Sequence, residues 1–345
     1  MNKSEALIKV SDVCRVRRLS RHTENTYRQW ISRFIDHVCQ YPQLAREERL
    51  RLFLERLAPR TAASTQNQAL NAVVFFYRDV LKQPLGDLGK WARAKRPKRI
   101  PSWLTQDEMG RMLDQMRGMT KLMAEMAYGG GLRIAELLAL RMKDVDVEGG
   151  TITVRGGKGD KDRVTCLPRS LAMRLGPYVA RVRALWERDR EDGRNPVYLP
   201  DGLERKFPGG GREWPWFWFW PAVGESTDPR SGTVRRHHVH EDTLGKALKT
   251  AARHAGLTKR VTAHTLRHSF ATALLETGAG IHQVQELLGH TSIETTQIYL
   301  HCLPLLGTRI VSPLDRVAEA KVVAFRPVGD AGSGPVLLKE EGRAS

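Results

Sequence analysis

The sequence predicts a mainly α-helical protein with a small antiparallel β-sheet (an α+β fold), divided into two domains. Three observations support this fold class: apolar residues recur three and four positions apart in the first ninety residues, a basic proline-containing segment follows, and a β-hairpin pattern lies near residues 151–167. With 345 residues, of which 41% are hydrophobic, the chain is long enough to build two cores.

Residues 1–93 are expected to form a helical domain. One of its two apolar series spans residues 70–81 and ends before Pro84, a residue that stops a helix. The polar faces of these helices carry arginines, so the segment is either a solvated bundle or a domain that clamps DNA, and its sequence alone does not choose between them. The other apolar series comes earlier in the chain and consists of Tyr27, Trp30, Ile31, Phe34, Ile35 and Val38.

Residues 94–101, with the sequence AKRPKRIP, are predicted to be an interdomain linker. The segment contains two prolines, which resist both helices and central strands, and four basic residues. That charge would also suit a segment that lies along a phosphate backbone.

Residues 102–317 are expected to form the second domain. Thr105 and Glu108 form a capping-box pattern that opens a helix, and residues 151–154 and 163–167 flank a glycine-rich turn as a hairpin does. After Pro168 the pattern is mainly helical, apart from an insertion at about residues 195–232. Residues 318–345 have weak periodicity and are expected to be a flexible tail.

The charge of the chain favours a polyanionic partner. The net charge is +18 and the isoelectric point is near 10.1, and nucleic acid is the commonest polyanion that such a protein meets. The basic residues are spread along the chain and not gathered on one amphipathic helix, which argues against acidic lipid. Charge alone leaves DNA, RNA and ribosomal partners open.

The expected compartment is the cytoplasm. No apolar run is long enough to cross a bilayer, and the first twenty residues lack the apolar core and cleavage site of a signal peptide. The four cysteines are widely separated, so neither a zinc site nor structural disulfides are expected.

Two short patterns near the end of the second domain bring chemically active side chains together. His264 and Arg267 are three positions apart, so a helix would present both on one face. Gly289 is placed to end a helix and leave His290 in a loop, and Thr291-Ser292 can cap a short helix that carries Tyr299.

Two further elements precede them in the chain. Arg133 follows three glycines at the first turn of a predicted helix, with Glu136 one turn later, and the tip of the hairpin presents Lys158. These motifs, in this order, resemble the tyrosine recombinase family over about residues 10–315. Members of this family have an N-terminal helical DNA-binding domain and a catalytic domain, and the resemblance implies the same two domains here.

The resemblance implies a role for each of these residues. Tyr299 would be the nucleophile that forms a 3′-phosphotyrosine, while the guanidinium groups of Arg133 and Arg267 would hold the phosphate oxygens. Lys158 would protonate the leaving 5′-oxygen, and neither a metal nor ATP is required. The remaining assignments are His264 as the base for the tyrosine proton, His290 as a hydrogen-bond donor to phosphate, and Glu136 as a supporting residue.

Several of these residues have a plainer interpretation. A lone tyrosine is more often part of a core than a nucleophile, and Lys161 is the second choice for the general acid. Arg141 and Lys143 are expected to be solvated charges at a helix end, and His268 to pack or to satisfy a backbone group. The histidines of residues 235–240 could suggest a metal site, but no cysteine or carboxylate cluster completes one, so DNA contact or plain structure is favoured.

The insertion contains half of the 8 tryptophans, which alternate at positions 214, 216, 218 and 220. A strand with this alternation would place the tryptophans on one face and the intervening phenylalanines on the other. Such a strand either packs against the catalytic core or presents ring faces that stack unpaired bases, and the physical argument alone favours packing.

The sequence of the insertion resembles the segment peculiar to integron integrases, which recombine gene-cassette sites folded from a single strand. The resemblance implies that the tryptophan run contains both core anchors and base contacts, and that a homotetramer assembles on single-stranded hairpin or duplex DNA. The candidate DNA contacts are Lys206, Trp214, Trp216, Trp218, Trp220 and His240.

Three alternatives remain at this level. A Xer-like or phage-type recombinase would act on ordinary duplex sites and would tolerate deletion of residues 198–221. A type IB topoisomerase would relax supercoils without a preferred site. A DNA-binding regulator on the same scaffold would bind DNA without cleaving it, although all six expected site residues are present.

Overall fold

The computed structural model describes residues 2–86, 94, 101–156, 162–200, 202–229 and 231–302. The chain divides into two compact units, Met1–Arg99 and Ile100–Ser345. Most of the predicted linker, the hairpin tip with Lys158 and Lys161, and the predicted tail lie outside the described residues.

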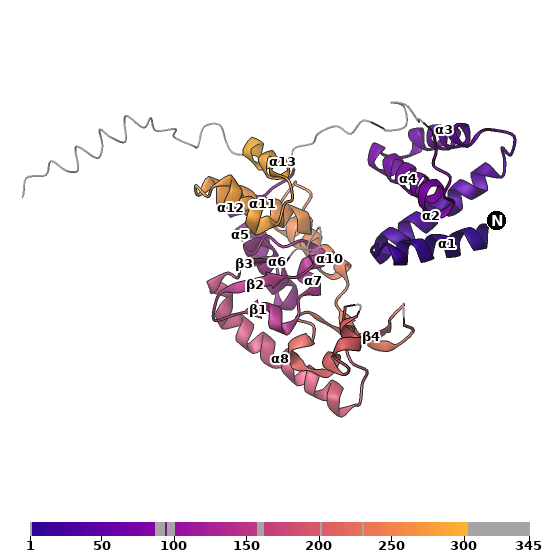
Figure 1. The fold of residues 1–345 in the computed structure, drawn as a ribbon. Helices are drawn as coiled ribbons and strands as arrows, with labels where there is room; N and C mark the ends of the chain where they lie inside the picture. The colour runs from indigo at the N-terminus through magenta and orange to yellow at the C-terminus, as the bar shows by residue number, and fades with distance from the viewer. Residues whose placement is uncertain are drawn as a thin grey trace, which may run out of the picture. The chain divides into compact units, whose positions relative to one another are not determined.

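The first unit is a helical bundle whose elements appear in indigo and purple in Figure 1. Asn2 and Ser20 cap the first two helices by accepting hydrogen bonds from backbone N–H groups of the first turn. The apolar series predicted around Trp30 and Phe34 faces the core, and the second series ends in a π-helical turn, Phe76–Val80. The helices are α1 (Lys3–Val16), α2 (Arg21–Val38), α3 (Arg46–Leu57) and α4 (Ala63–Phe75).

The second unit is mainly helical, as predicted. The capping box between Thr105 and Glu108 opens its first helix. The helices α11, α12 and α13 gather at one end of the unit, and α8 lies at the other (Figure 1). The helices are α5 (Gln106–Asp114), α6 (Gly118–Gly129), α7 (Ile134–Ala139), α8 (Ala172–Glu191), α9 (Leu203–Lys206), α10 (Glu241–His254), α11 (Ala263–Glu276), α12 (Ile281–Leu288) and α13 (Ile293–Gln297).

The predicted hairpin is present in a three-stranded antiparallel sheet. Its strands are β1 (Val145–Asp146), β2 (Thr151–Val154) and β3 (Arg163–Cys166), in the order β1-β2-β3. The register pairs Val154 with Arg163, so β3 begins at the point where the chain returns from the hairpin tip.

The aromatic run does not form the predicted strand. Residues Trp214–Trp216 make a 3₁₀ turn, and β4 (Pro221–Thr227) begins only after the run, paired with β5 (Val234–His238). Residues 217–220 are all buried, phenylalanines and tryptophans alike, so the expected alternation between two faces is wrong. The reason is tertiary packing: Phe217 and Phe219 exchange backbone hydrogen bonds with residues 140–142, and the core surrounds this stretch.

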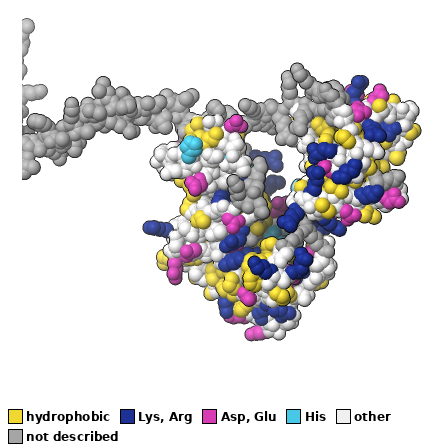
Figure 2. Space-filling model, viewed as in Figure 1, with side chains coloured by type: hydrophobic (Ala, Val, Ile, Leu, Met, Phe, Trp, Pro, Cys, Tyr) yellow, Lys and Arg dark blue, Asp and Glu magenta, His cyan; other side chains and the backbone are white. Residues whose placement is uncertain are grey.

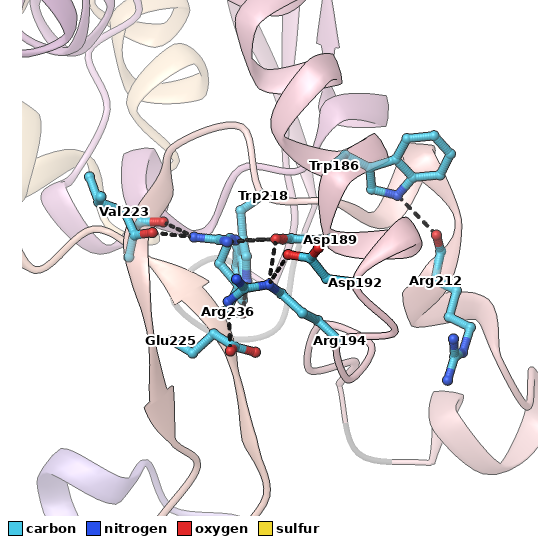
Figure 3. A network of polar contacts seen from close by, with 10 residues as sticks. Trp186, Asp189, Asp192, Arg194, Arg212, Trp218, Val223, Glu225 and Arg236 are labelled. Carbon is cyan, nitrogen blue, oxygen red and sulfur yellow. Dashed lines mark hydrogen bonds and ion pairs between the residues drawn. The ribbon is translucent and has the colours of Figure 1, made fainter.

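A buried ion pair ties the β4–β5 hairpin to α8 (Figure 3). Arg236 donates two hydrogen bonds to Asp189, at 2.5 and 2.6 Å, and two more to the carbonyl oxygens of Ala222 and Val223. Both side chains are almost fully buried, and Trp218 donates its indole N–H to the Arg236 carbonyl oxygen at 3.2 Å. The insertion is thus bound into the core of the unit.

Arg141 is not a solvated charge at a helix end, which corrects the prediction for this residue. Arg141 is 6% exposed, lies 3.2 Å above the ring of Trp218 and donates to the carbonyl oxygens of Trp216 and Tyr198. Burial lowers the pKa of Arg141 to about 9. Lys143 is exposed, but its ammonium lies 2.9 Å from the ring centroid of Trp216.

Among the described residues, no helix is both long and apolar enough to span a bilayer. Within the same ranges, no three His, Cys, Asp or Glu side chains are grouped as a metal site would need, and His237 and His238 pack against Trp218.

The substitution Asp189→Asn should destabilise the second unit by about 3 kcal/mol or more, because it leaves the Arg236 charge buried without a counter-ion. Urea unfolding followed by tryptophan fluorescence measures the loss, since six of the 8 tryptophans lie beyond residue 100. The control is Asp192→Asn, which neutralises an exposed carboxylate near the same arginine cluster. Equal unfolding midpoints for the two variants would contradict the argument.

Candidate functional site

A glycine turn between α6 and α7 forms one side of the site. Gly131 has φ of +61°, and a Cβ atom there would lie 2.4 Å from the ring of Phe270 on α11. Glycine therefore allows the left-handed backbone and the close approach of α11. The turn ends at Arg133, the N-cap residue of α7, as predicted for the start of that helix.

The carboxylate of Glu136 is the centre of the polar contacts in the site. It accepts hydrogen bonds from the Arg133 guanidinium at 2.6 Å and from the Arg133 backbone N–H at 2.9 Å. Arg163 binds the same carboxylate through two nitrogens, at 2.9 and 2.6 Å. Burial by itself would raise the pKa of Glu136, but the hydrogen bonds from Arg163 and Arg133 outweigh it and lower the pKa to about 2.

Arg267 extends this cluster from α11. Its side chain is 3% exposed and donates to the carbonyl oxygens of Gly131, at 2.7 Å, and Leu288, at 2.6 Å. It also lies 3.7 Å from Glu136. Burial, with Arg133 next, lowers the pKa of Arg267 to about 10, which keeps it charged at neutral pH. Three guanidinium groups beside one carboxylate leave excess positive charge, which suits an anion such as a phosphodiester.

Arg163 is a site residue that the sequence analysis missed. It lies at the start of β3, and its third hydrogen bond joins Nε to the carbonyl oxygen of Leu287 at 2.9 Å. It therefore links the hairpin, Glu136 and the end of α12. The sequence held only a weak signal, a basic residue two positions after Lys161.

Gly289 ends α12, as predicted, and leaves His290 in the following loop. Gly289 has φ of +62°, and a Cβ atom there would lie 2.8 Å from Cδ of Arg163. His290 Nδ1 lies 2.9 Å from the hydroxyl of Thr296, and its ring stacks on Tyr299 with centroids 6.2 Å apart. Burial, reinforced by Arg267 and Arg133, lowers the pKa of His290 to about 4.

Tyr299 lies in a 3₁₀ turn, Ile298–Cys302, directly after α13 and not within that helix. Its side chain is 3% exposed and packs against the end of α11 and α12. The phenolic oxygen lies 3.0 Å from Nδ1 of His268, so His268 contacts the tyrosine and does not merely fill space or satisfy a backbone group. The sequence signal was present, because His264 and His268 are four residues apart on one helical face.

The structure thus brings together most of the predicted catalytic residues. Arg133, Arg267, His290 and Tyr299 converge beside Glu136. His264 is exposed, with its ring centroid 6.4 Å from that of His268. Lys158 and Lys161 lie outside the described residues.

The predicted DNA contacts separate into exposed and buried residues. Trp218 and Trp220 are 4% and 0% exposed, so they are core anchors with no ring face open to a base. Trp216 is half-buried beneath Lys143, and Trp214 packs on Trp186 with Arg183 nearby.

Two other predicted contacts are exposed. Lys206 ends α9, and His240 is 74% exposed and caps α10 by accepting from the Asp242 backbone N–H. Lys and Arg side chains are spread over the visible face of each unit (Figure 2).

The chain is similar to known proteins over most of its length. Residues 102–304 match the phage integrase family, and residues 7–87 match its N-terminal SAM-like domain. An integrase/recombinase of Escherichia coli is 46% identical over 89% of this chain and 94% of its own length. The tyrosine recombinase XerA of Pyrococcus furiosus is 31% identical over 86% of this chain and 89% of its own.

A solved structure shares the fold. The XerH site-specific recombinase, bound to a palindromic difH substrate in a post-cleavage complex, has a TM-score of 0.57 and 20% identity. The alignment covers 90% of this chain and 82% of that one.

The low pKa of Glu136 has a consequence for stability. Because the folded state lowers this pKa to about 2, the carboxylate stabilises the fold above its unfolded pKa, and this contribution is lost as the pH falls toward 2. Glu136→Gln should therefore flatten the acid-induced loss of unfolding free energy between about pH 4.5 and 2, by roughly 2–3 kcal/mol. Urea unfolding curves recorded across this pH range measure the free energy of unfolding. Glu148→Gln, at an exposed position after β1, should keep the wild-type slope, and a wild-type slope in Glu136→Gln would contradict the assignment.

Proposed function

The chain belongs to the phage integrase family of tyrosine recombinases, which cleave and rejoin DNA strands, and we propose that Tyr299 is the nucleophile with which it does so. The observation that carries this proposal is the convergence of Arg133, Arg267 and His290 around Tyr299, with Glu136 between the arginines. The phenolic oxygen attacks the scissile phosphorus, a 3′-phosphotyrosine forms and a free 5′-hydroxyl leaves.

The arginines stabilise the charge that develops during this attack. A pentacoordinate phosphorus carries more negative charge on its non-bridging oxygens than the diester does, and a guanidinium fork matches those oxygens. Glu136 holds Arg133 in place through two hydrogen bonds, and carbonyl oxygens hold Arg267. These side chains are therefore set before DNA arrives, and little reorganisation remains for the reaction.

The other groups manage protons and position the phosphate. We assign His290 to a hydrogen bond with a phosphate oxygen and His264, as the candidate base, to the tyrosine proton. Lys158, with Lys161 as second choice, protonates the 5′-oxygen. The chain's own cations supply the positive charge, and the phosphotyrosine conserves the energy of the broken bond, so neither metal nor ATP is needed in this scheme.

We propose further that the chain is an integron integrase that inserts and excises gene cassettes. The proposal rests on the insertion at residues 195–232, whose sequence resembles that of integron integrases. Its surface is suited to DNA: Lys206 lies near Phe207, which is 51% exposed, and Lys143, from outside the insertion, covers the half-buried ring of Trp216. The proposed substrate is a cassette site folded from one strand, with unpaired bases held by stacking, and the proposed assembly is a homotetramer on DNA.

A Xer-type recombinase that acts on duplex sites is the second candidate. It is favoured by the 31% identity to XerA of Pyrococcus furiosus over 86% of this chain. Deletion of residues 198–221 does not separate the candidates, because the deletion removes four buried aromatic residues and would unfold the second unit. Point substitutions at positions of the insertion that are not fully buried are needed.

Wild-type protein should form a covalent adduct with labelled cassette DNA folded from one strand, detected on a denaturing gel. Tyr299→Phe should bind the same DNA and form no adduct, because it lacks the phenolic oxygen. An adduct that persists in Tyr299→Phe would refute the nucleophile.

The same cassette sequence as a perfect duplex is the substrate control. An adduct on duplex alone would retain the recombinase and exclude the integron assignment. Binding without any adduct would favour a DNA-binding regulator on this scaffold.

Trp216→Ala should reduce the adduct on the folded strand at least fivefold, since stacking on a base contributes about 1–3 kcal/mol. The adduct on any duplex that the protein cleaves should change less than twofold. Trp103→Ala is the matched control, because Trp103 is another half-buried tryptophan with a lysine near its ring, outside the insertion. Equal losses on both substrates would argue against a role of the insertion in binding unpaired bases.

A further inference from the structure

The contact between His268 and Tyr299 has no role in the scheme above. Nδ1 of His268 lies 3.0 Å from the phenolic oxygen, and the ring centroids are 5.5 Å apart. This is hydrogen-bond distance to the atom that attacks phosphorus. The predicted base, His264, is exposed one helical turn earlier on α11.

The contact is set by packing between separate elements. His268 lies on α11, which packs against the 3₁₀ turn Ile298–Cys302, and Tyr299 is part of an apolar cluster with Phe270 and Leu288. The stacked ring of His290 covers Tyr299 as well. The phenol is therefore held with its oxygen at His268, and not left to rotate in solvent.

We propose that His268, in place of His264, accepts the phenolic proton when Tyr299 attacks DNA. In cleavage, the bond between the tyrosine oxygen and phosphorus forms, the bond between phosphorus and the 5′-oxygen breaks, and the phenolic proton passes to Nδ1 of His268. A separate acid protonates the 5′-oxygen. In rejoining, His268 returns its proton to the departing tyrosine oxygen. His268 is then a catalytic residue, and this inference rests on the proposed role of Tyr299.

In the free protein, the surroundings of His268 keep its ring neutral and make it a weak base. Burial, followed by the charges of His264 and Arg267, lowers the pKa of His268 to about 4, so its ring is neutral at pH 7 and offers a lone pair. The titratable groups that face it are His264 and Arg267 on its own helix, together with Tyr299 and the nearby His290. A bound phosphodiester adds negative charge that favours the protonated ring, so proton acceptance becomes easier when substrate is present.

Two substitutions separate proton transfer from simple positioning. The substitution His268→Asn places an amide close to the position of Nδ1, so the side chain can accept the hydrogen bond but cannot take the proton, whereas His268→Phe removes both functions. Both His268→Asn and His268→Phe should slow adduct formation about 100-fold or more, the usual contribution of a general base. His254→Phe, at the exposed end of α10, should react at the wild-type rate.

The second measurement changes the acidity of the nucleophile. A fluorinated tyrosine incorporated at position 299 has a more acidic phenol, which needs less help from a base. The deficit of His268→Asn relative to the protein with His268 should therefore shrink when both carry the fluorinated residue. Gel-shift assays and thermal melting in parallel check that the variants bind DNA and fold.

The outcomes are distinct. A wild-type rate in His268→Asn, or a deficit that fluorination leaves unchanged, would overturn the role in proton transfer while Tyr299 remains the nucleophile. If the wild-type protein forms no Tyr299-dependent adduct, the proposed function fails and this inference fails with it.

Discussion

The carboxylate of Glu136 is the interaction on which the rest of the site depends. It binds Arg133 and Arg163 directly and lies 3.7 Å from Arg267, so three like charges are held together that would otherwise repel one another. Because the surroundings are largely buried, this attraction is less screened than at a surface. The arrangement fixes cations from α7, β3 and α11 around one position, and a phosphate is the ligand that such a position suits.

The same carboxylate joins parts of the chain that are far apart in sequence. Arg163 reaches from the start of β3 to the end of α12, where Gly289 turns the chain toward His290 and Tyr299. A side chain at Gly289 would collide with Arg163, so the glycine serves both the turn and the contact. One buried arginine therefore connects the hairpin to the segment that leads to Tyr299.

The aromatic insertion has a structural part and an exposed part. Residues 217–220 and the Arg236–Asp189 pair anchor it in the core, while Trp216 with Lys143 and Phe207 with Lys206 lie at its surface. Anchoring lowers the entropy that a surface loop would lose on binding a flexible nucleic acid strand. The buried rings of the insertion thus anchor the half-buried Trp216 and the exposed Phe207.

The sequence by itself determined the helical pattern, the hairpin, the capping box at Thr105 and the stop at Gly289, because each depends on local periodicity or a single backbone preference. It also supplied the motif residues Arg133, Arg267, His290 and Tyr299. Only the tertiary structure decided that Trp218 and Trp220 are buried, that Arg141 is enclosed, that Arg163 binds Glu136, and that His268 contacts the tyrosine. These facts depend on which distant segments pack together, and local patterns do not encode such contacts.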